Sequence, residues 1–170
     1  MPHSDGKAYA GTMTIRLDPL DPNSFPRWVE RSSREYVADL VSLGTSPGEA
    51  QRQAESSLRE TFPESRPGPD NAVFNLIDDA GVGVGYLWVG RDRSDDPTSW
   101  WVWDILIDSE YRGRGYGREG MKLAEEYARS RGAATLGLNV FGFNHSARKL
   151  YESLGYETMS IKMRKTLAAD

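Results

Sequence analysis

The sequence predicts an α/β (α+β) domain, with a mixed, mostly antiparallel central sheet flanked by about four helices. Two observations carry this prediction. Apolar residues recur at helical spacing between residues 24 and 62, and then at strand spacing between residues 72 and 107. After residue 107, a helical stretch joins the strand-like segment 100–107 to another at 135–141, which is the order of a parallel strand pair with a right-handed crossover.

The size of the chain favours one domain. It has 170 residues, of which 38% are hydrophobic, enough for one core and too few for two. Residues 12–170 are therefore expected to form a single domain. Residues 1–11 are polar, so we expect a disordered N-terminal tail. The tail has no apolar run for a signal peptide or membrane span, which predicts a soluble, cytoplasmic protein that does not bind membranes.

One strand and two helices are predicted in the first third of the chain. Residues 13–17 alternate in polarity as a short strand does. A helix should run from an N-cap at Ser24 to Gly44. The second helix should begin at Ser46, where a proline at the first helical position and a glutamate at the third complete a capping box. It should end before Pro63.

The remaining elements build the sheet and the last two helices. In chain order they are strands 72–77, 84–89 and 100–107, a helix at 117–131, a strand at 135–141, a helix at 144–154 and a terminal strand pair at 156–167. The first two strands form a hairpin. The next, at 100–107, is nearly all apolar, as expected in the middle of a sheet. It should lie parallel to strand 135–141, because a helix connects the two.

Charge and composition exclude several classes of function. The net charge of -4 gives no basic field for nucleic acid, so no nucleic-acid partner is expected. The chain has no cysteine, which excludes a cysteinyl thioester intermediate. Its two histidines are too few for a zinc cluster, and we expect no metal.

The loop after the central strand carries the strongest functional signal. Its glycines remove side chains at the start of a helix, where backbone N–H groups and the helix dipole attract phosphate. Its arginines add charge-assisted hydrogen-bond donors. The loop is predicted to hold a pyrophosphate through Arg112, Gly113, Arg114, Gly115, Tyr116, Gly117 and Arg118. The alternative is a glycine-rich surface turn with solvated arginines.

Other motifs fit this chain less well. Residues 115–120 spell the dinucleotide fingerprint G-x-G-x-x-G, but they do not follow the strand directly, and the next strand offers Asn139 in place of an acidic residue. A Walker A loop is absent, since the sequence contains no Gly-Lys-Ser or Gly-Lys-Thr. Ser46 stands in a G-x-S-x-G pattern, but a helix precedes it and Pro47 has no N–H for an oxyanion hole.

Two motifs resemble those of the GCN5-related N-acetyltransferase (GNAT) superfamily. Arg112-x-x-Gly115-x-Gly117 resembles its R/Q-x-x-G-x-G/A loop, and residues 144–156 resemble its N-x-x-A-x-x-L-Y-x-x-x-G-F segment. The resemblance is strongest to small bacterial members. It implies a parallel strand pair that splays apart, acetyl-CoA as the acyl donor, and direct transfer to a primary amine of a small molecule or peptide. A homodimer is compatible with it.

The resemblance also implies roles for individual residues. Backbone groups of Ile105, Leu106 and Ile107 would pair with the pantetheine arm of the cofactor as an added strand. Asn144, which is also a suitable helix N-cap, would contact the same arm. Tyr151 would donate a hydrogen bond or proton to the leaving sulfur, although packing alone also accounts for an aromatic residue there.

The sequence leaves the general base open. The resemblance places it at Trp101 or Asn139, and neither side chain accepts a proton near neutral pH. A water held by Asn139, the carboxylate of Asp104 or another residue, or an acceptor that arrives neutral would serve instead. Asp104 lies in an apolar strand, where its pKa should rise, and strand alternation puts it on the face opposite Trp101. The missing base also allows a second function, that of a non-catalytic acyl-CoA sensor or structural module.

Overall fold

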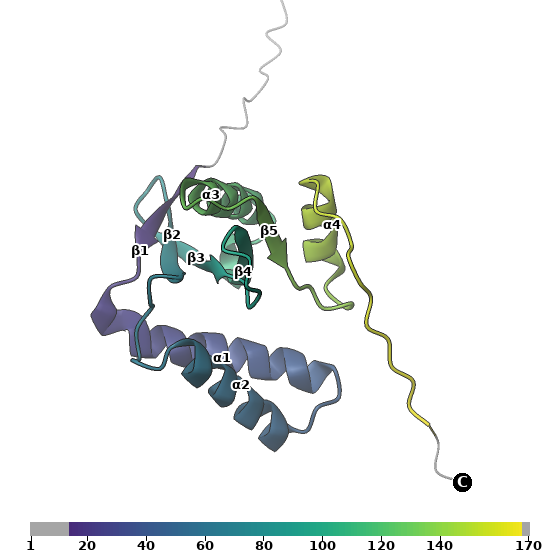
Figure 1. Cartoon of the computed structure of the whole chain (residues 1–170). Coiled ribbons are helices and arrows are strands. Elements are labelled where there is room, and N and C mark those ends of the chain that lie inside the picture. The colour runs from purple at the N-terminus through teal and green to yellow at the C-terminus, as the bar shows by residue number, and fades with distance from the viewer. Residues whose placement is uncertain (1–13, 168–170) are drawn as a thin grey trace, which may run out of the picture. The chain divides into compact units, whose positions relative to one another are not determined.

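The computed structural model describes residues 14–167, which fall into two compact units divided after Asn139. The first unit contains the sheet and its three helices, and the second contains the last helix (Figure 1). The predicted N-terminal tail, residues 1–11, lies outside the described residues. Within residues 14–167, no helix combines the length and the apolar character needed to cross a membrane.

Five strands form one sheet in the order β1-β2-β3-β4-β5. Their bounds are β1 (Ile15–Pro19), β2 (Asn71–Asp78), β3 (Gly83–Arg91), β4 (Ser99–Ile107) and β5 (Thr135–Leu138). The first four strands pair antiparallel, and β4 pairs parallel with β5. The predicted fold class is therefore confirmed, including the parallel pair at the end of a mostly antiparallel sheet.

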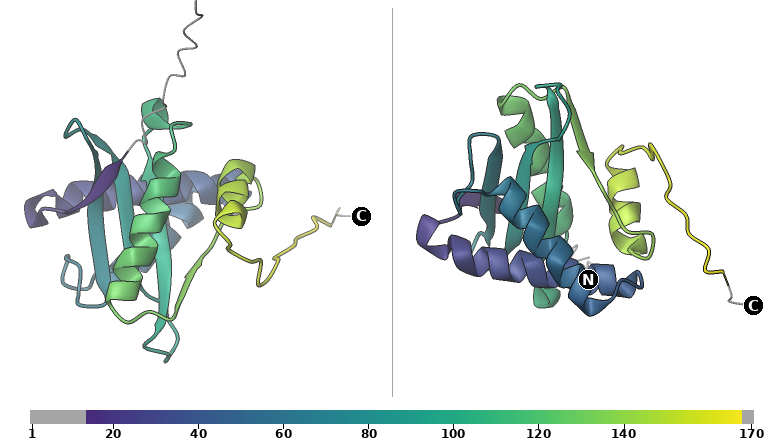
Figure 2. Two further views of the ribbon diagram at one scale, coloured as in Figure 1. Left: turned by 90° about the horizontal axis from the view of Figure 1, so that it is seen from above. Right: turned by 60° about the horizontal axis from the view of Figure 1, so that its bottom comes forward.

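Helices cover both faces of this sheet. The amphipathic α3 (Tyr116–Ser130) lies along one face, and α1 (Phe25–Ser42) and α2 (Pro47–Thr61) lie across the other (Figures 1 and 2). The buried residues of α3 recur every three or four positions, as a helix with one apolar stripe requires: Tyr116, Gly120, Met121, Ala124 and Ala128. The start of α3, and with it the glycine-rich loop, is thereby held against the sheet.

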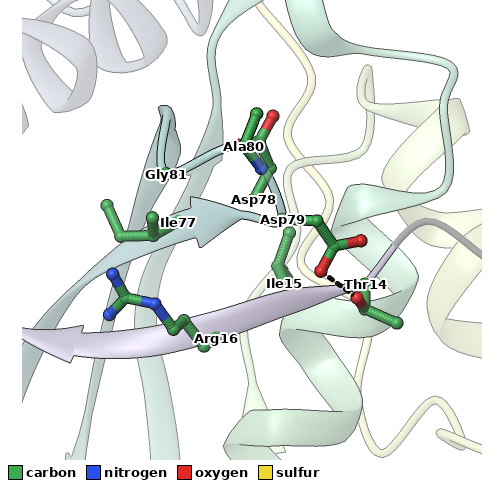
Figure 3. A pocket seen from close by; sticks show the side chains of 8 residues that line it. All are labelled: Thr14, Ile15, Arg16, Ile77, Asp78, Asp79, Ala80 and Gly81. Atoms are coloured by element: carbon green, nitrogen blue, oxygen red, sulfur yellow. Dashed lines mark hydrogen bonds between the residues drawn. The ribbon is translucent and has the colours of Figure 1, made fainter.

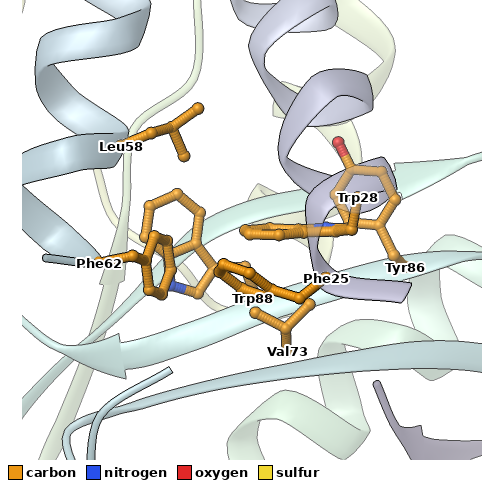
Figure 4. Packing of buried hydrophobic residues seen from close by; sticks show 7 residues of the cluster. All are labelled: Phe25, Trp28, Leu58, Phe62, Val73, Tyr86 and Trp88. Atoms are coloured by element: carbon orange, nitrogen blue, oxygen red, sulfur yellow. The ribbon is translucent and has the colours of Figure 1, made fainter. Parts of the chain in front are cut away.

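An aromatic core fixes α1 and α2 on the sheet (Figure 4). Its residues come from α1, from α2 and the residue that follows it, and from β2 and β3: Phe25, Trp28, Leu58, Phe62, Val73, Tyr86 and Trp88. The ring of Trp28 meets that of Trp88 edge to face, with centroids 5.6 Å apart. This packing sets the position of the next turn of α1, which carries Arg31 and Ser32.

The second unit contains α4 (His145–Ser153), which is capped at both ends. The side chain of Asn144 accepts a hydrogen bond of 3.1 Å from the backbone N–H of Ala147, as an N-cap residue does. At the other end, Gly155 has φ 92°, and the N–H of Tyr156 donates to the carbonyl of Tyr151 at 3.0 Å. This is the Schellman arrangement that glycine favours.

The C-terminal end of the chain differs from the prediction. The strand expected at 135–141 ends at Leu138, and the strand pair expected at 156–167 is wrong, because the described residues after Leu138 contain no strand. Met159, Ile161 and Met163 do alternate with polar residues, but each is at least 72% exposed. Alternation describes a strand only where a second strand supplies the hydrogen-bonding partner.

Candidate active site

Only the first half of β4 pairs with β5. The parallel ladder runs from Ser99 opposite Thr135 to Val102 opposite Leu138 and then stops. The rest of β4, residues 103–107, has no pairing partner in β5. The two strands therefore separate halfway along β4, as predicted for a splayed pair.

Backbone groups of β4 point into this open edge. The N–H of Asp108 donates to the carbonyl of Val84 in β3 at 2.9 Å. Because an antiparallel ladder alternates, the backbone groups of Ile107 and Ile105 then point away from β3, and those of Leu106 point toward it. Of the three residues predicted to pair with a cofactor, Ile105 and Ile107 offer their backbone, and Leu106 packs against the aromatic core.

The glycine-rich loop follows directly after this edge. A single 3-10 turn (Ser109–Tyr111) leads into it, and Gly113 and Gly115 adopt φ values of 74° and 90°. L-residues with side chains rarely adopt this left-handed conformation, so glycine is needed at both positions. A Cβ atom at either glycine would meet nothing within 4 Å. The loop is thus open in front of its glycines, with room for a ligand.

Donors converge on this loop at the start of α3. Gly115 is the N-cap residue of that helix, so the backbone N–H groups of the loop residues up to Gly115 lie outside the helical hydrogen-bond pattern. The backbone N–H of Arg118 donates to the carbonyl of Gly115 at 3.0 Å, which closes the first turn of the helix. No described residue accepts a hydrogen bond from the N–H of Gly113 or Gly115. Backbone donors at a helix start are the arrangement that binds phosphate.

The arginines of the loop have different surroundings. Arg112 is exposed, and its Nε donates to the carbonyl of Ile107 at 2.8 Å, which ties the loop to the end of β4. Arg114 is exposed and lies over the ring of Tyr111, 5.5 Å from its centroid. Tyr116 is buried, so it can face a ligand only through its backbone. Arg118 is half-buried in the first turn of α3.

The last glycine of the formal dinucleotide fingerprint has a packing role instead. A Cβ atom at Gly120 would lie 3.0 Å from Cδ1 of Ile105 and 3.4 Å from Cδ1 of Leu76. Glycine therefore allows α3 to approach the sheet closely. This accounts for the pattern without a dinucleotide.

A β-bulge interrupts β4 at the point where β5 separates from it. Trp88 pairs with Asp104 and Val89 pairs with Val102, so Trp103 is an extra residue between them. The Trp103 ring stacks on Trp88, with centroids 5.7 Å apart, and lies 6.2 Å from the Trp101 ring. The bulge thus places Trp103 and Asp104 on the same face, the one that α1 covers.

The prediction that Asp104 and Trp101 lie on opposite faces is therefore wrong. It assumed strict alternation, which the bulge breaks between these residues. Asp104 instead shares the α1 side of the sheet with Trp101 and Trp103.

Asp104 is bound there by two hydroxyl groups. Its Oδ2 accepts hydrogen bonds from Ser32 Oγ of α1 at 2.9 Å and from Tyr86 Oη of β3 at 2.6 Å. Burial raises the pKa of the Asp104 carboxyl, and the negative charges of Asp39 and Glu35 raise it further, whereas the two hydrogen bonds lower it. Ser32 and Tyr86 were not predicted as site residues, because nothing in the sequence pairs them with Asp104.

The other predicted site residues lie after β5. Asn139 follows the last residue of β5 and is exposed. Asn144 caps α4, and Tyr151 is half-buried on that helix, with its ring centroid 6.0 Å from that of Tyr156. Both belong to the second unit, residues 140–167.

A separate hollow lies at the other end of the sheet, between β1 and the turn from β2 to β3 (Figure 3). Arg16, Asp78 and Asp79 line it, and Thr14 donates a hydrogen bond to Asp79 across it. None of the predicted site residues lies in this hollow.

Residues 26–156 match the model of the Acetyltransferase (GNAT) family. The protein therefore belongs to this family and is an acyltransferase. The N-acetyltransferase YycN of Bacillus subtilis, described as uncharacterized, is 29% identical over 156 residues, which cover 91% of this chain and 100% of YycN. The crystal structure of YycN superposes with a TM-score of 0.84 and 28% identity, covering 92% of this chain and 100% of that one.

Two further proteins match over a shorter segment or at lower identity. An L-2,4-diaminobutyric acid acetyltransferase of Streptomyces coelicolor is 35% identical over 77 residues, or 45% of each chain. An aminoglycoside N-acetyltransferase crystallised in complex with CoA shares the fold at a TM-score of 0.55 and 14% identity, covering 92% of this chain and 97% of that one.

Proposed function

We propose that the protein is an acetyl-CoA-dependent N-acetyltransferase that transfers an acetyl group directly to a primary amine of a small molecule or peptide. The observation that carries the proposal is the continuity of the open edge of β4 with the glycine-rich loop. An extended thioester arm needs a strand edge to pair with, and its pyrophosphate needs backbone donors at the end of that edge. Both features occur here in that order.

The cofactor would be held mainly by the backbone. Ile105 would exchange hydrogen bonds with the pantetheine amides, and Ile107 would donate its N–H, because its carbonyl already accepts from Arg112. The N–H groups around Gly113 and Gly115 would bind the pyrophosphate. Arg114 and Arg118 would add charge-assisted donors, and Arg112 would keep the loop against β4. Asn144 is proposed as a further contact to the pantetheine arm.

The transfer itself needs a proton acceptor and a proton donor. Tyr151 is proposed as the donor to the leaving sulfur, since a phenol is protonated at neutral pH. The acceptor of the amine proton would be Asp104 or a water held by Asn139. No covalent acyl-enzyme is expected, because the chain has no cysteine.

The acceptor would enter on the α1 side of the sheet. Trp101 is half-buried there and offers aromatic surface, whereas the Trp103 ring already contacts Trp88 and the guanidinium of Arg93. Aromatic faces and a carboxylate together suit an alkylammonium group. The diaminobutyrate acetyltransferase relative, by its name, acts on such an amine.

The test is a screen of acceptors with detection of the free thiol of CoA. Diamines, polyamines, aminoglycosides and peptide N-termini are offered with acetyl-CoA, and acetyl-CoA affinity is measured separately by calorimetry. Turnover of one amine class with intersecting initial-velocity lines is expected. Tight acetyl-CoA binding without turnover of any amine would instead favour the acyl-CoA sensor, which the relatives named N-acetyltransferases do not favour.

A further inference from the structure

The hydrogen bonds to Asp104 leave one of its oxygens unused. Ser32 and Tyr86 both donate to Oδ2. Oδ1 accepts no hydrogen bond from a described residue, and it does not belong to the buried polar atoms that lack a partner. The carboxylate is thus fixed through one oxygen, while the other has no partner in the described part of the chain and keeps some contact with solvent in this half-buried residue.

The two donors are set rigidly in the core. Ser32 is 4% exposed and Tyr86 is 1% exposed. The Tyr86 ring packs edge to face on Trp28, with centroids 6.0 Å apart. Burial raises the pKa of the Tyr86 phenol, and the negative charge of Asp104 raises it further, so the hydroxyl remains a hydrogen-bond donor. Neither donor can turn away to water.

No cation of the described chain neutralises Asp104. The neighbouring Arg31 forms its ion pair with Asp108, and its guanidinium lies over the ring of Tyr86, 5.1 Å from the centroid. The other charges that act on Asp104 are the carboxylates Glu35 and Asp39 of α1. A fixed carboxylate with negative neighbours and an accessible oxygen attracts a cation from outside.

We propose that Asp104 receives the ammonium group of the acceptor at Oδ1 and accepts its proton, and that Ser32 and Tyr86 are positioning residues for this carboxylate. The proposal rests on the proposed function. It selects Asp104 over a water held by Asn139 as the proton acceptor. It also assigns the acceptor to the class of alkylammonium compounds, which enter protonated.

The step balances as follows. The acceptor nitrogen enters as R–NH3+ and gives one proton to Asp104, which passes it to solvent later. The neutral nitrogen then forms a bond to the thioester carbonyl carbon, the carbon–sulfur bond breaks, and the second proton goes to the sulfur of CoA. The products are the acetamide, CoA and the proton released from Asp104.

The bulge at Trp103 explains why this carboxylate is available to the reaction. It brings Asp104 onto the α1 side next to the residues of β4 that have no partner in β5. Bulges are common beside active sites because they redirect a side chain without ending the strand. If alternation continued unbroken from Trp101 through Trp103, Asp104 would face α3.

The experiment compares pH profiles of kcat/KM for the best amine of the acceptor screen. Removing either hydroxyl in Tyr86→Phe or Ser32→Ala takes a hydrogen bond from the ionised form of Asp104, so the acidic limb should move upward by about one pH unit. Activity should return toward the wild-type level at higher pH. Asp104→Asn should lower kcat/KM by about a hundredfold. The affinity for acetyl-CoA, measured by calorimetry, should remain unchanged. Unchanged affinity would show that each variant is folded.

Matched controls exist in the same elements. Ser42→Ala removes a serine hydroxyl from α1 that bonds the carbonyl of Ala38, and Tyr127→Phe removes a phenol from α3 on the other face. Both should leave the profile in place. The assignment of Asp104 would be overturned if the pH profiles of Tyr86→Phe and Ser32→Ala did not move, or if kcat/KM of Asp104→Asn stayed within threefold of wild type. The proposed acetyltransferase function would stand in either case. A wild-type protein that turns over no amine would overturn both.

Discussion

Replacing Gly115 with alanine is the sharpest test of the cofactor site. A second glycine, Gly132, has the same backbone conformation outside the site, so its replacement should cost the same conformational free energy. Gly115 has φ 90° before α3 and Gly132 has φ 87° after it, and a Cβ at either would meet nothing within 4 Å. Alanine in this conformation costs about 1–2 kcal/mol, offset by about 0.4–1 kcal/mol from the stiffer unfolded chain. Gly115→Ala and Gly132→Ala should each lose about 1 kcal/mol of unfolding free energy, which lowers Tm by about 2–4 °C.

Only Gly115→Ala should weaken the binding of acetyl-CoA. Its methyl group would stand in the space where the phosphate approaches the N–H groups of the loop. Losing one charge-assisted hydrogen bond costs about 1.5–3 kcal/mol, so the Kd for acetyl-CoA should rise at least about tenfold. Calorimetry with both variants separates this effect from stability. Equal Kd values for Gly115→Ala, Gly132→Ala and wild type would remove the loop from the cofactor site.

Two further predictions concern catalysis and the acceptor. Tyr151→Phe should lower kcat by about a hundredfold with little change in acetyl-CoA affinity, since the hydroxyl acts only as the thioester breaks. A loss below about threefold would reduce Tyr151 to a packing role. At Gly137 a Cβ would lie 2.3 Å from Cζ3 of Trp101, so Gly137→Ala must displace that ring. The KM for the acceptor should then rise with acetyl-CoA affinity unchanged, and Gly68→Ala, which meets nothing within 4 Å, is the control.

Local sequence signals predicted most of the secondary structure because they act through near neighbours. The helix α2 begins at Pro47 with Ser46 as its N-cap residue, as expected, although the Ser46 side chain makes no capping hydrogen bond. The apolar strand predicted at 100–107 is β4, Ser99–Ile107. Proline, glycine and apolar spacing act within a few residues, so they can be read without the rest of the chain. The strands predicted after residue 138 failed because a strand depends on a distant partner.

The part of the site that the backbone forms could be predicted from the sequence. The part in which side chains from distant elements contact one another could not. Gly113 and Gly115 were identified because their conformation leaves a signature in the sequence. The group around Asp104 was not, because Ser32 is 72 residues away in the chain. The bulge at Trp103 had no sequence signature either, and it reversed the predicted face of Asp104.

The stability of Asp104→Asn distinguishes a carboxylate kept for function from one kept for structure. The pKa of Asp104 is raised in the folded protein, so the stability that its protonated form contributes is present below the unfolded value of about 3.9 and is lost as the pH rises through the folded value. Above that range the ionised group destabilises the fold. Asparagine keeps an acceptor for the two hydroxyls and cannot ionise. Urea unfolding should therefore show Asp104→Asn gaining stability relative to wild type between pH 4 and pH 8, although its activity falls. A relative loss over that range would mean that the charged carboxylate holds α1 on the sheet, and its role would be structural.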